Sequence, residues 1–135
     1  MAEDHGVVYR ELKGYKYELL APFRQTLPDV FYTPGRLIQV PYIELGSSWV
    51  EGQEGYAWDG ASGPTIDTPD TRRAALVHDM LYQLMRVEVL PLSLKGEVDA
   101  LFRDLLREDG MSAFRAWYWW LAVKMFGRPV SAPPR

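Results

Sequence analysis

The sequence predicts an α+β domain in which a short antiparallel β-sheet from the N-terminal half packs on about three C-terminal helices. Up to about residue 60, short segments rich in aromatic and branched side chains are divided by prolines, which is typical of short strands. From Thr68 onward, apolar residues recur at steps of three and four, which is typical of helices. We expect residues 1–127 to form a single domain, mainly β over about 1–60 and mainly α over 68–127. Residues 128–135 are expected to form a flexible Pro-rich tail.

Length and composition limit the class of protein. With 135 residues, 47% apolar and 24% charged, the chain has the size and composition of one globular domain. A formal net charge of −3 argues against a nucleic-acid binder with a large basic surface, and the lack of cysteine excludes disulfides and cysteine nucleophiles. No apolar run approaches the roughly 18–20 residues of a bilayer span, and the first residues lack the features of a signal peptide. We therefore expect a protein made in the cytoplasm, with no transmembrane segment and no nucleic-acid partner.

Strands are predicted in the first half from local composition. Residues 15–20 and 36–40 are rich in aromatic and branched side chains. Tyr42–Leu45 and Trp49–Glu51 flank Gly46-Ser-Ser, which predicts a hairpin with a short loop. Since prolines interrupt this half of the chain, we expect the strands to be few, short and partly at sheet edges.

The first helix has a clear start signal in Thr68-Pro69-Asp70. Thr68 supplies an N-cap hydroxyl, Pro69 suits the first turn, and an acid follows near the positive end of the helix dipole. The helical pattern then continues to about Arg86.

Two further helices follow. One is predicted from about Ser93 to Asp109, where Gly110 suits a left-handed cap. The next is predicted from a Ser112 cap to Phe126, with a glycine at position 127 as its stop.

The densest chemical signal is the glycine-rich segment 56–65, followed by a helix that carries His78, Asp79 and Tyr82. In a tight glycine-rich loop, successive carbonyl oxygens can point at one hard cation such as Ca²⁺. His78 and Tyr82 lie one helical turn apart on the same side, with Asp79 beside them. The imidazole suits a general base, and the carboxylate suits a metal ligand.

Asp99, on the apolar side of the predicted second helix, is the candidate to orient His78. We expect the first two helices to pair antiparallel and to bring His78, Asp79 and Asp99 together under the loop at 58–64. Each of these residues also has a purely structural interpretation. The His78-Asp79 pair can make hydrogen bonds within the fold, and Asp99 can be a solvated helix carboxylate. The segment 60–65 can be a tight turn in which Asp59 bonds to the backbone.

The residues at 55–65, Gly-Tyr-Ala-Trp-Asp-Gly-Ala-Ser-Gly-Pro-Thr, and at 76–84, Leu-Val-His-Asp-Met-Leu-Tyr-Gln-Leu, carry a resemblance. In this order they closely resemble a phage and prophage family catalogued as domain of unknown function 1353. The resemblance covers about residues 14–108. It implies a phage-encoded protein made in the host cytoplasm, with the virion as a candidate destination, and it brings no activity with it.

The same residues resemble, more distantly, the phospholipases A2 of secreted enzymes and of parvovirus capsid proteins. Those enzymes have a glycine-rich calcium loop followed by a helix with His-Asp-x-x-Tyr. In them, three loop carbonyls at alternate positions bind Ca²⁺. The matching positions here, Trp58, Gly60 and Ser62, lie twenty, eighteen and sixteen residues before His78. The resemblance implies a Ca²⁺ site made of these carbonyls and the Asp79 carboxylate.

The phospholipase resemblance also implies that the first two helices form a phospholipase A2-like pair, and it implies catalytic roles. His78 becomes the base that activates water, the Gly60 N–H becomes the oxyanion donor, and Tyr82 becomes a structural hydrogen-bond partner. In the viral enzymes an Asp in Ala-Asp-x-x-Phe orients the His, and here Asp99, in Val-Asp-Ala-Leu-Phe, lies twenty-one residues after His78. The loop departs from the secreted pattern, because Asp59-Gly-Ala-Ser-Gly replaces Cys-Gly-x-Gly-Gly. The Asp59 carboxylate either joins the ion or caps the turn.

The predicted third helix is apolar on nearly all sides and includes Trp117, Trp119 and Trp120. Such a helix usually belongs to the core or to a partner interface. Its Trp and Tyr side chains, with nearby Arg and Lys, also suit contact with a phospholipid surface. Burial, contact in a homo-oligomer or with another viral structural protein, and membrane contact all stay open.

Two hypotheses of different classes follow. In the first, the chain is a phospholipase A2-like, calcium-dependent acyl-ester hydrolase that acts on phospholipid through its His-Asp site. In the second, it is a non-catalytic virion- or tail-associated structural protein that retains the loop-helix scaffold.

Overall fold

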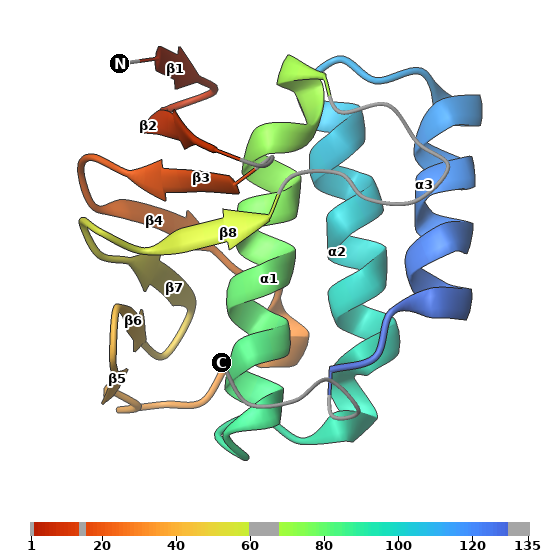
Figure 1. The fold of residues 1–135 in the computed structure, drawn as a ribbon. Coiled ribbons are helices and arrows are strands. Elements are labelled where there is room, and N and C mark those ends of the chain that lie inside the picture. Colours follow the sequence, from red (N-terminus) through yellow and green to blue (C-terminus); the bar gives the residue numbers. More distant parts are fainter. Residues whose placement is uncertain (1, 14–15, 60–67, 130–135) are drawn as a thin grey trace.

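The computed structural model describes residues 2–13, 16–59 and 68–129 (Figure 1). Over these ranges the chain forms two four-stranded antiparallel sheets followed by three α-helices, which confirms the predicted α+β class. The strands are β1 (Ala2–Asp4), β2 (Val7–Leu12), β3 (Lys16–Leu19), β4 (Phe23–Thr26), β5 (Ile38–Val40), β6 (Ile43–Leu45), β7 (Trp49–Gly52) and β8 (Ala57–Asp59). The helices are α1 (Arg72–Arg86), α2 (Lys95–Glu108) and α3 (Ala113–Phe126). Of the predicted tail, positions 130–135 lie outside the described residues; Arg128 is exposed and Pro129 is buried.

The strands divide between two sheets, where the sequence predicts one. The first sheet has the order β1-β2-β3-β8 and the second β4-β7-β6-β5. The chain passes from the first to the second between Leu19 and Phe23, at Pro22, which has no amide hydrogen to donate to a ladder. The predicted hairpin is confirmed, since β6 pairs antiparallel with β7 and Leu45 lies opposite Val50.

One prediction about the first half is wrong. The sequence predicts a loop from residue 56 onward, but residues 57–59 form β8, in which Trp58 lies opposite Tyr17 of β3. The Trp58 side chain is only 1% exposed, and its ring lies 5.6 Å from that of Tyr17 and 6.2 Å from that of Tyr9. Burial of this indole against two strands outweighs the turn tendency of the glycines that follow it.

All three predicted helices are confirmed, and their starts show how local sequence works. The Ser112 Oγ caps α3 by accepting a hydrogen bond of 3.3 Å from the backbone N–H of Arg115. Thr68 behaves differently from the prediction, because its hydroxyl donates to the Asp70 carboxylate and makes no capping bond. The predicted start signal therefore begins a 3₁₀ turn over Pro69–Thr71, and α1 follows this turn.

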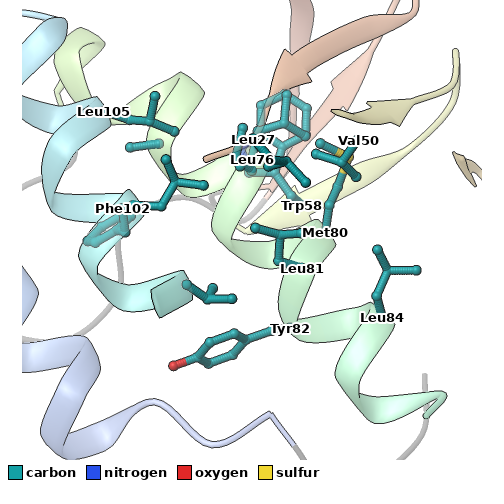
Figure 2. Packing of buried hydrophobic residues seen from close by; sticks show 14 of the residues in the cluster. Leu27, Val50, Trp58, Leu76, Met80, Leu81, Tyr82, Leu84, Phe102 and Leu105 are labelled. Carbon is teal, nitrogen blue, oxygen red and sulfur yellow. The ribbon is translucent and has the colours of Figure 1, made fainter. Parts of the chain in front are cut away.

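The elements form layers (Figure 1). α1 lies next to the strands, α2 in the middle and α3 furthest from them, and α1 and α2 run antiparallel as predicted. α1 packs on β7 of one sheet and on β8 of the other, so a single helix covers both. Figure 2 shows its two faces, with Met80 near Val50 and Trp58 and with Leu81 on the side toward α2. No helix within the described ranges is long and apolar enough to cross a bilayer.

Candidate active site

The antiparallel packing of α1 and α2 brings His78 and Asp99 together. His78 lies in the middle of α1 and Asp99 near the start of α2. The His78 Nε2 atom lies 2.8 Å from Asp99 Oδ1, and the two side chains are 13% and 2% exposed. The structure thus places the predicted base and its predicted orienting carboxylate within hydrogen-bond distance.

Asp99 accepts hydrogen bonds from two further side chains. The Tyr82 hydroxyl donates to Oδ1 at 2.7 Å, and the Lys95 ammonium donates to Oδ2 at 2.7 Å. Burial by itself raises the pKa of the Asp99 carboxyl, but the hydrogen bonds, led by that from His78, hold the pKa below its usual value. The carboxylate is therefore ionised at neutral pH and can only accept hydrogen bonds.

This ionised acceptor determines which ring nitrogen of His78 carries a proton. Since Asp99 can only accept, Nε2 must donate, and in the neutral imidazole Nδ1 is then left with a free lone pair. Within the described ranges Nδ1 has no hydrogen-bond partner. The ring packs in tilted contacts against the rings of Tyr82 and Phe102, at centroid distances of 4.0 and 4.9 Å. The atom that can act as a base is therefore Nδ1.

Tyr82 stays a donor to Asp99 over the whole working range of pH. Burial, together with the neighbouring Asp99 carboxylate, raises the pKa of its phenol well above the ordinary value. Figure 2 shows the Tyr82 ring projecting from α1, with its oxygen directed away from the labelled apolar side chains. Gly127, predicted only as a helix stop, also serves Tyr82: a Cβ at this position would lie 2.6 Å from the Tyr82 hydroxyl. The chain after α3 can approach the network this closely only because residue 127 has no side chain.

Lys95 is a member of the network that the sequence analysis missed. Its ammonium bonds to Asp99 and also lies 3.3 Å from the carbonyl oxygens of Val123 and Lys124 at the end of α3. The available signal was the four-residue spacing of Lys95 and Asp99, which places the two side chains on one helix face. Lys95 therefore connects the end of α3 to the Asp99 carboxylate.

Asp79 belongs to a different contact. Its Oδ2 atom accepts a hydrogen bond of 2.8 Å from the Tyr56 hydroxyl, which also lies 3.3 Å from Gln83 Oε1. The sequence predicts His78, Asp79 and Asp99 in one cluster, and the structure brings together only His78 and Asp99. Asp79 instead joins α1 to the residue just before β8. No local pattern marks Tyr56 as its partner, because the contact depends on how α1 packs on the strands.

The predicted calcium-loop residues are only partly described. Trp58 lies in β8 with its side chain in the core, and its buried Nε1 atom has no hydrogen-bond partner among the described residues. Asp59 ends β8 opposite Lys16. Gly60 and Ser62 lie outside the described residues, so their roles stay predictions. Across the ranges that the structure describes, no group of three or more His, Asp or Glu side chains is arranged to hold a metal ion.

The three tryptophans of α3 have different surroundings. Trp119 is 6% exposed and packs on Phe102 at a centroid distance of 6.1 Å, so it belongs to the core and not to a contact surface. Trp117 is 45% exposed. Trp120 is half-buried, with the cations of Arg103 and Lys124 over its ring at 5.2 and 4.8 Å. Of the predicted contact residues, Trp117 and Trp120 remain available at the surface.

The sequence profile of the family described as "Protein of unknown function (DUF1353)" matches residues 38–123, which is more than half of the chain. The chain belongs to this family. The match contains β5 to β8, α1 and α2, and hence His78, Tyr82, Lys95 and Asp99 of this DUF1353 protein. No curated protein and no solved structure matches the chain.

Proposed function

We propose that this DUF1353 chain is a phage-encoded, phospholipase A2-like acyl-ester hydrolase made in the host cytoplasm. The observation that carries the proposal is the 2.8 Å contact between His78 Nε2 and Asp99 Oδ1, in a buried network with Tyr82. An imidazole held by an ionised carboxylate is the arrangement that general-base catalysis needs. The phospholipase resemblance of the residues around His78 supplies the substrate class, a fatty-acid ester of a glycerophospholipid.

In the proposed reaction, His78 Nδ1 takes a proton from a water molecule while the water oxygen bonds to the ester carbonyl carbon. The electron pair that moves onto the carbonyl oxygen then returns, and the bond between the carbonyl carbon and the glycerol oxygen breaks. The imidazolium gives its proton to the departing alkoxide, which leaves a free fatty acid and a lysophospholipid. Asp99 keeps the ring in place and stabilises the imidazolium that forms between these steps.

Asp79 is the residue proposed to hold Ca²⁺, together with main-chain oxygens of the segment at Trp58, Gly60 and Ser62. One carboxylate with carbonyl oxygens is a set of hard oxygen ligands, which suits Ca²⁺ better than softer metals. When bound, the ion supplies positive charge close to the developing oxyanion. The described contact of Asp79 with Tyr56 holds this carboxylate at the β8 side of α1.

Fatty-acid release from mixed phosphatidylcholine–phosphatidylglycerol vesicles tests this proposal. We expect release by the wild-type protein in Ca²⁺ and its loss in EGTA. His78→Gln is expected to lower the rate by about 10²–10⁴-fold, the usual range for a general base. His5→Gln is the matched control, since His5 is the other of the chain's two histidines, its side chain is 40% exposed, and it lies near Asp109 instead of Asp99.

Two results would contradict the proposal. One is no fatty-acid release from wild-type protein that circular dichroism shows to be folded. The other is equal release by the wild-type protein and His78→Gln, which would assign the activity to another group.

A second function is supported by a different observation. α3 exposes Phe114 by 74% and Phe126 by 71%, values that a helix facing only water rarely shows. A virion- or tail-associated protein that retains the scaffold without catalysis would cover this face with a second copy or another viral structural protein. Analytical ultracentrifugation separates the two functions, since the structural role requires a stable oligomer of the chain or of the chain with that viral partner.

A further inference from the structure

The outward side of α3 carries a continuous apolar stripe. Its members recur at helical spacing, so they lie on one side of the helix, and Figure 1 shows α3 at the edge of the molecule furthest from the strands. We define the α3 stripe as Phe114, Trp117, Tyr118, Leu121 and Met125. Of these, Phe114 is 74%, Trp117 45%, Tyr118 39% and Met125 61% exposed, and Leu121 is half-buried. The stripe therefore offers an apolar face that the described part of the chain does not cover.

Positive charge accompanies the stripe. Arg115, Lys124 and Arg128 lie in or just after α3, and residues 113–128 contain no Asp or Glu, although the chain has eighteen acidic against fifteen basic residues. The Arg115 side chain is 43% exposed and reaches Asp70 only at 3.7 Å, and Lys124 is exposed. The edge of the molecule that is richest in exposed aromatic side chains is thus also free of acidic residues along its helix.

We propose that the α3 stripe docks the protein on an anionic phospholipid bilayer surface. Trp and Tyr side chains suit the headgroup region, because an apolar ring lies beside a polar N–H or O–H, and basic residues beside them bind anionic headgroups. A second copy of the chain is a poorer occupant. Two stripes packed antiparallel would bring Arg115 of one copy near Lys124 of the other, and like charges facing each other are unfavourable.

Docking through α3 would bring the candidate active site close to lipid; this inference rests on the proposed function. Lys95 bonds both to Asp99 at 2.7 Å and to the carbonyl oxygens of Val123 and Lys124 at 3.3 Å. The end of the docking helix therefore lies beside the His78–Asp99 network. A protein docked through α3 presents this network close to the lipid whose ester it is proposed to cleave.

Sedimentation with sucrose-loaded vesicles tests the docking without hydrolysis. His78→Gln protein in EGTA is mixed with vesicles of phosphatidylcholine alone or with about one third phosphatidylglycerol. We expect binding to the anionic vesicles and weaker binding at high salt. Trp117→Glu and Met125→Glu, each added to that protein, are expected to weaken binding by about tenfold or more, since each puts a charge into the apolar face. Leu37→Glu is the matched control, because Leu37 is 62% exposed and lies outside α3; it is expected to bind normally.

Three outcomes would overturn the docking proposal: no binding to anionic vesicles, equal binding by the stripe variants, or a wild-type oligomer that the stripe variants dissociate. The last would assign the stripe to a second copy. A parallel assay of the wild-type protein on a short-chain phospholipid below its micelle concentration keeps the two proposals apart. Hydrolysis in this assay without vesicle binding would support the proposed hydrolase and contradict the docking surface. Vesicle binding without hydrolysis would support the docking surface and contradict the hydrolase.

Discussion

Asp99 and Asp109 are buried carboxylates ten residues apart, near the start of α2 and directly after its end, but their partners differ. The side chains are 2% and 4% exposed. Asp109 accepts two hydrogen bonds from one guanidinium, at 3.0 Å from Arg73 Nε and 2.7 Å from Arg73 Nη2. Asp99 accepts from the imidazole of His78, the phenol of Tyr82 and the ammonium of Lys95.

The difference shows what distinguishes a structural carboxylate from one that can serve catalysis. The hydrogen bond with Asp109 raises the pKa of Arg73 further above its already high value, so this guanidinium keeps its proton at every accessible pH. The pair ties α1 to the end of α2. An imidazole also lies near Asp109, but His5 Nδ1 is 3.5 Å from Asp109 Oδ1 and its side chain is 40% exposed, so it is not held in the core as His78 is. Imidazoles in general gain and lose a proton near neutral pH, so the network of Asp99 contains a group that suits proton transfer. Both carboxylates are buried, so burial does not distinguish them. What distinguishes them is whether a buried partner can exchange a proton.

Exchanging the two carboxylates for amides gives the largest expected difference. Asp99→Asn should lower the rate of fatty-acid release by about 10²–10⁴-fold, because an amide can donate to Nε2 and no longer stabilises an imidazolium. Asp109→Asn should release fatty acid at the wild-type rate. The measurement is initial rate per folded protein, with folding checked by circular dichroism. Similar rates for the two variants would contradict the assignment of a catalytic role to Asp99 and a structural role to Asp109.

Removing the cation of the structural pair should act on stability instead. Arg73→Met leaves Asp109 buried without its two-bond partner, and we expect the free energy of unfolding to fall by about 3 kcal/mol. Urea denaturation measures this change. Arg10→Met is the control, because the Arg10–Glu18 pair is 55% and 25% exposed, and exposed pairs contribute less than about 1 kcal/mol. Equal losses in the two variants would mean that burial of Asp109 does not matter.

Tyr82→Phe should give a smaller effect on both properties. It removes one donor to Asp99 Oδ1 but keeps the ring, so we expect about 1–2 kcal/mol less stability. The hydrolysis rate should fall by about tenfold, as is usual when a group that supports a catalytic residue is removed. Tyr118→Phe, on an exposed hydroxyl, should unfold like the wild type. A Tyr82→Phe protein with unchanged stability and rate would show that the hydrogen bond to Asp99 is dispensable.

The pH dependence of stability should show the smallest effect. Since the pKa of Asp99 lies below its ordinary value of 3.8, the unfolded chain binds a proton at higher pH than the folded one. The stabilisation from ionised Asp99 is thus fully present above that ordinary value and is lost as pH falls through the lower, folded pKa. The difference in unfolding free energy between wild type and Asp99→Asn should shrink in this acid range. A difference that grows with acidity would contradict this.

The helices could be predicted because their signals are local. The Ser112 cap of α3, the apolar period of α1 and the stop at Gly110 each lie within a few residues of the element that they define. The strands β1, β2, β4 and β8 were missed. β1 and β2 pair with each other across the turn at His5-Gly6, a local signal that was overlooked. β4 and β8 pair with β7 and β3, which lie far away along the chain. Trp58 is the clearest example, since its burial against Tyr17 overrides the glycines that follow it.

The same rule divides the candidate site. His78 and Tyr82 share a helix face at four-residue spacing, and Asp99 stands at the distance the phospholipase resemblance implies, so all three were found. Lys95 was missed although its four-residue spacing to Asp99 was available as a signal. The contact between Tyr56 and Asp79 had no signal in the sequence, because it exists only once α1 has packed on β8.

Nitrogen-15 NMR of the His78 ring tests most directly whether Asp99 prepares it as a base. At about pH 8 imidazoles are mostly neutral, and each ring nitrogen then reports whether it carries a proton. We expect His78 of the wild-type protein to carry its proton on Nε2, with Nδ1 unprotonated, and Asp99→Asn to lose this preference. A wild-type ring protonated on Nδ1 would contradict the assignment of Nδ1 as the base, and with it the proposed hydrolysis.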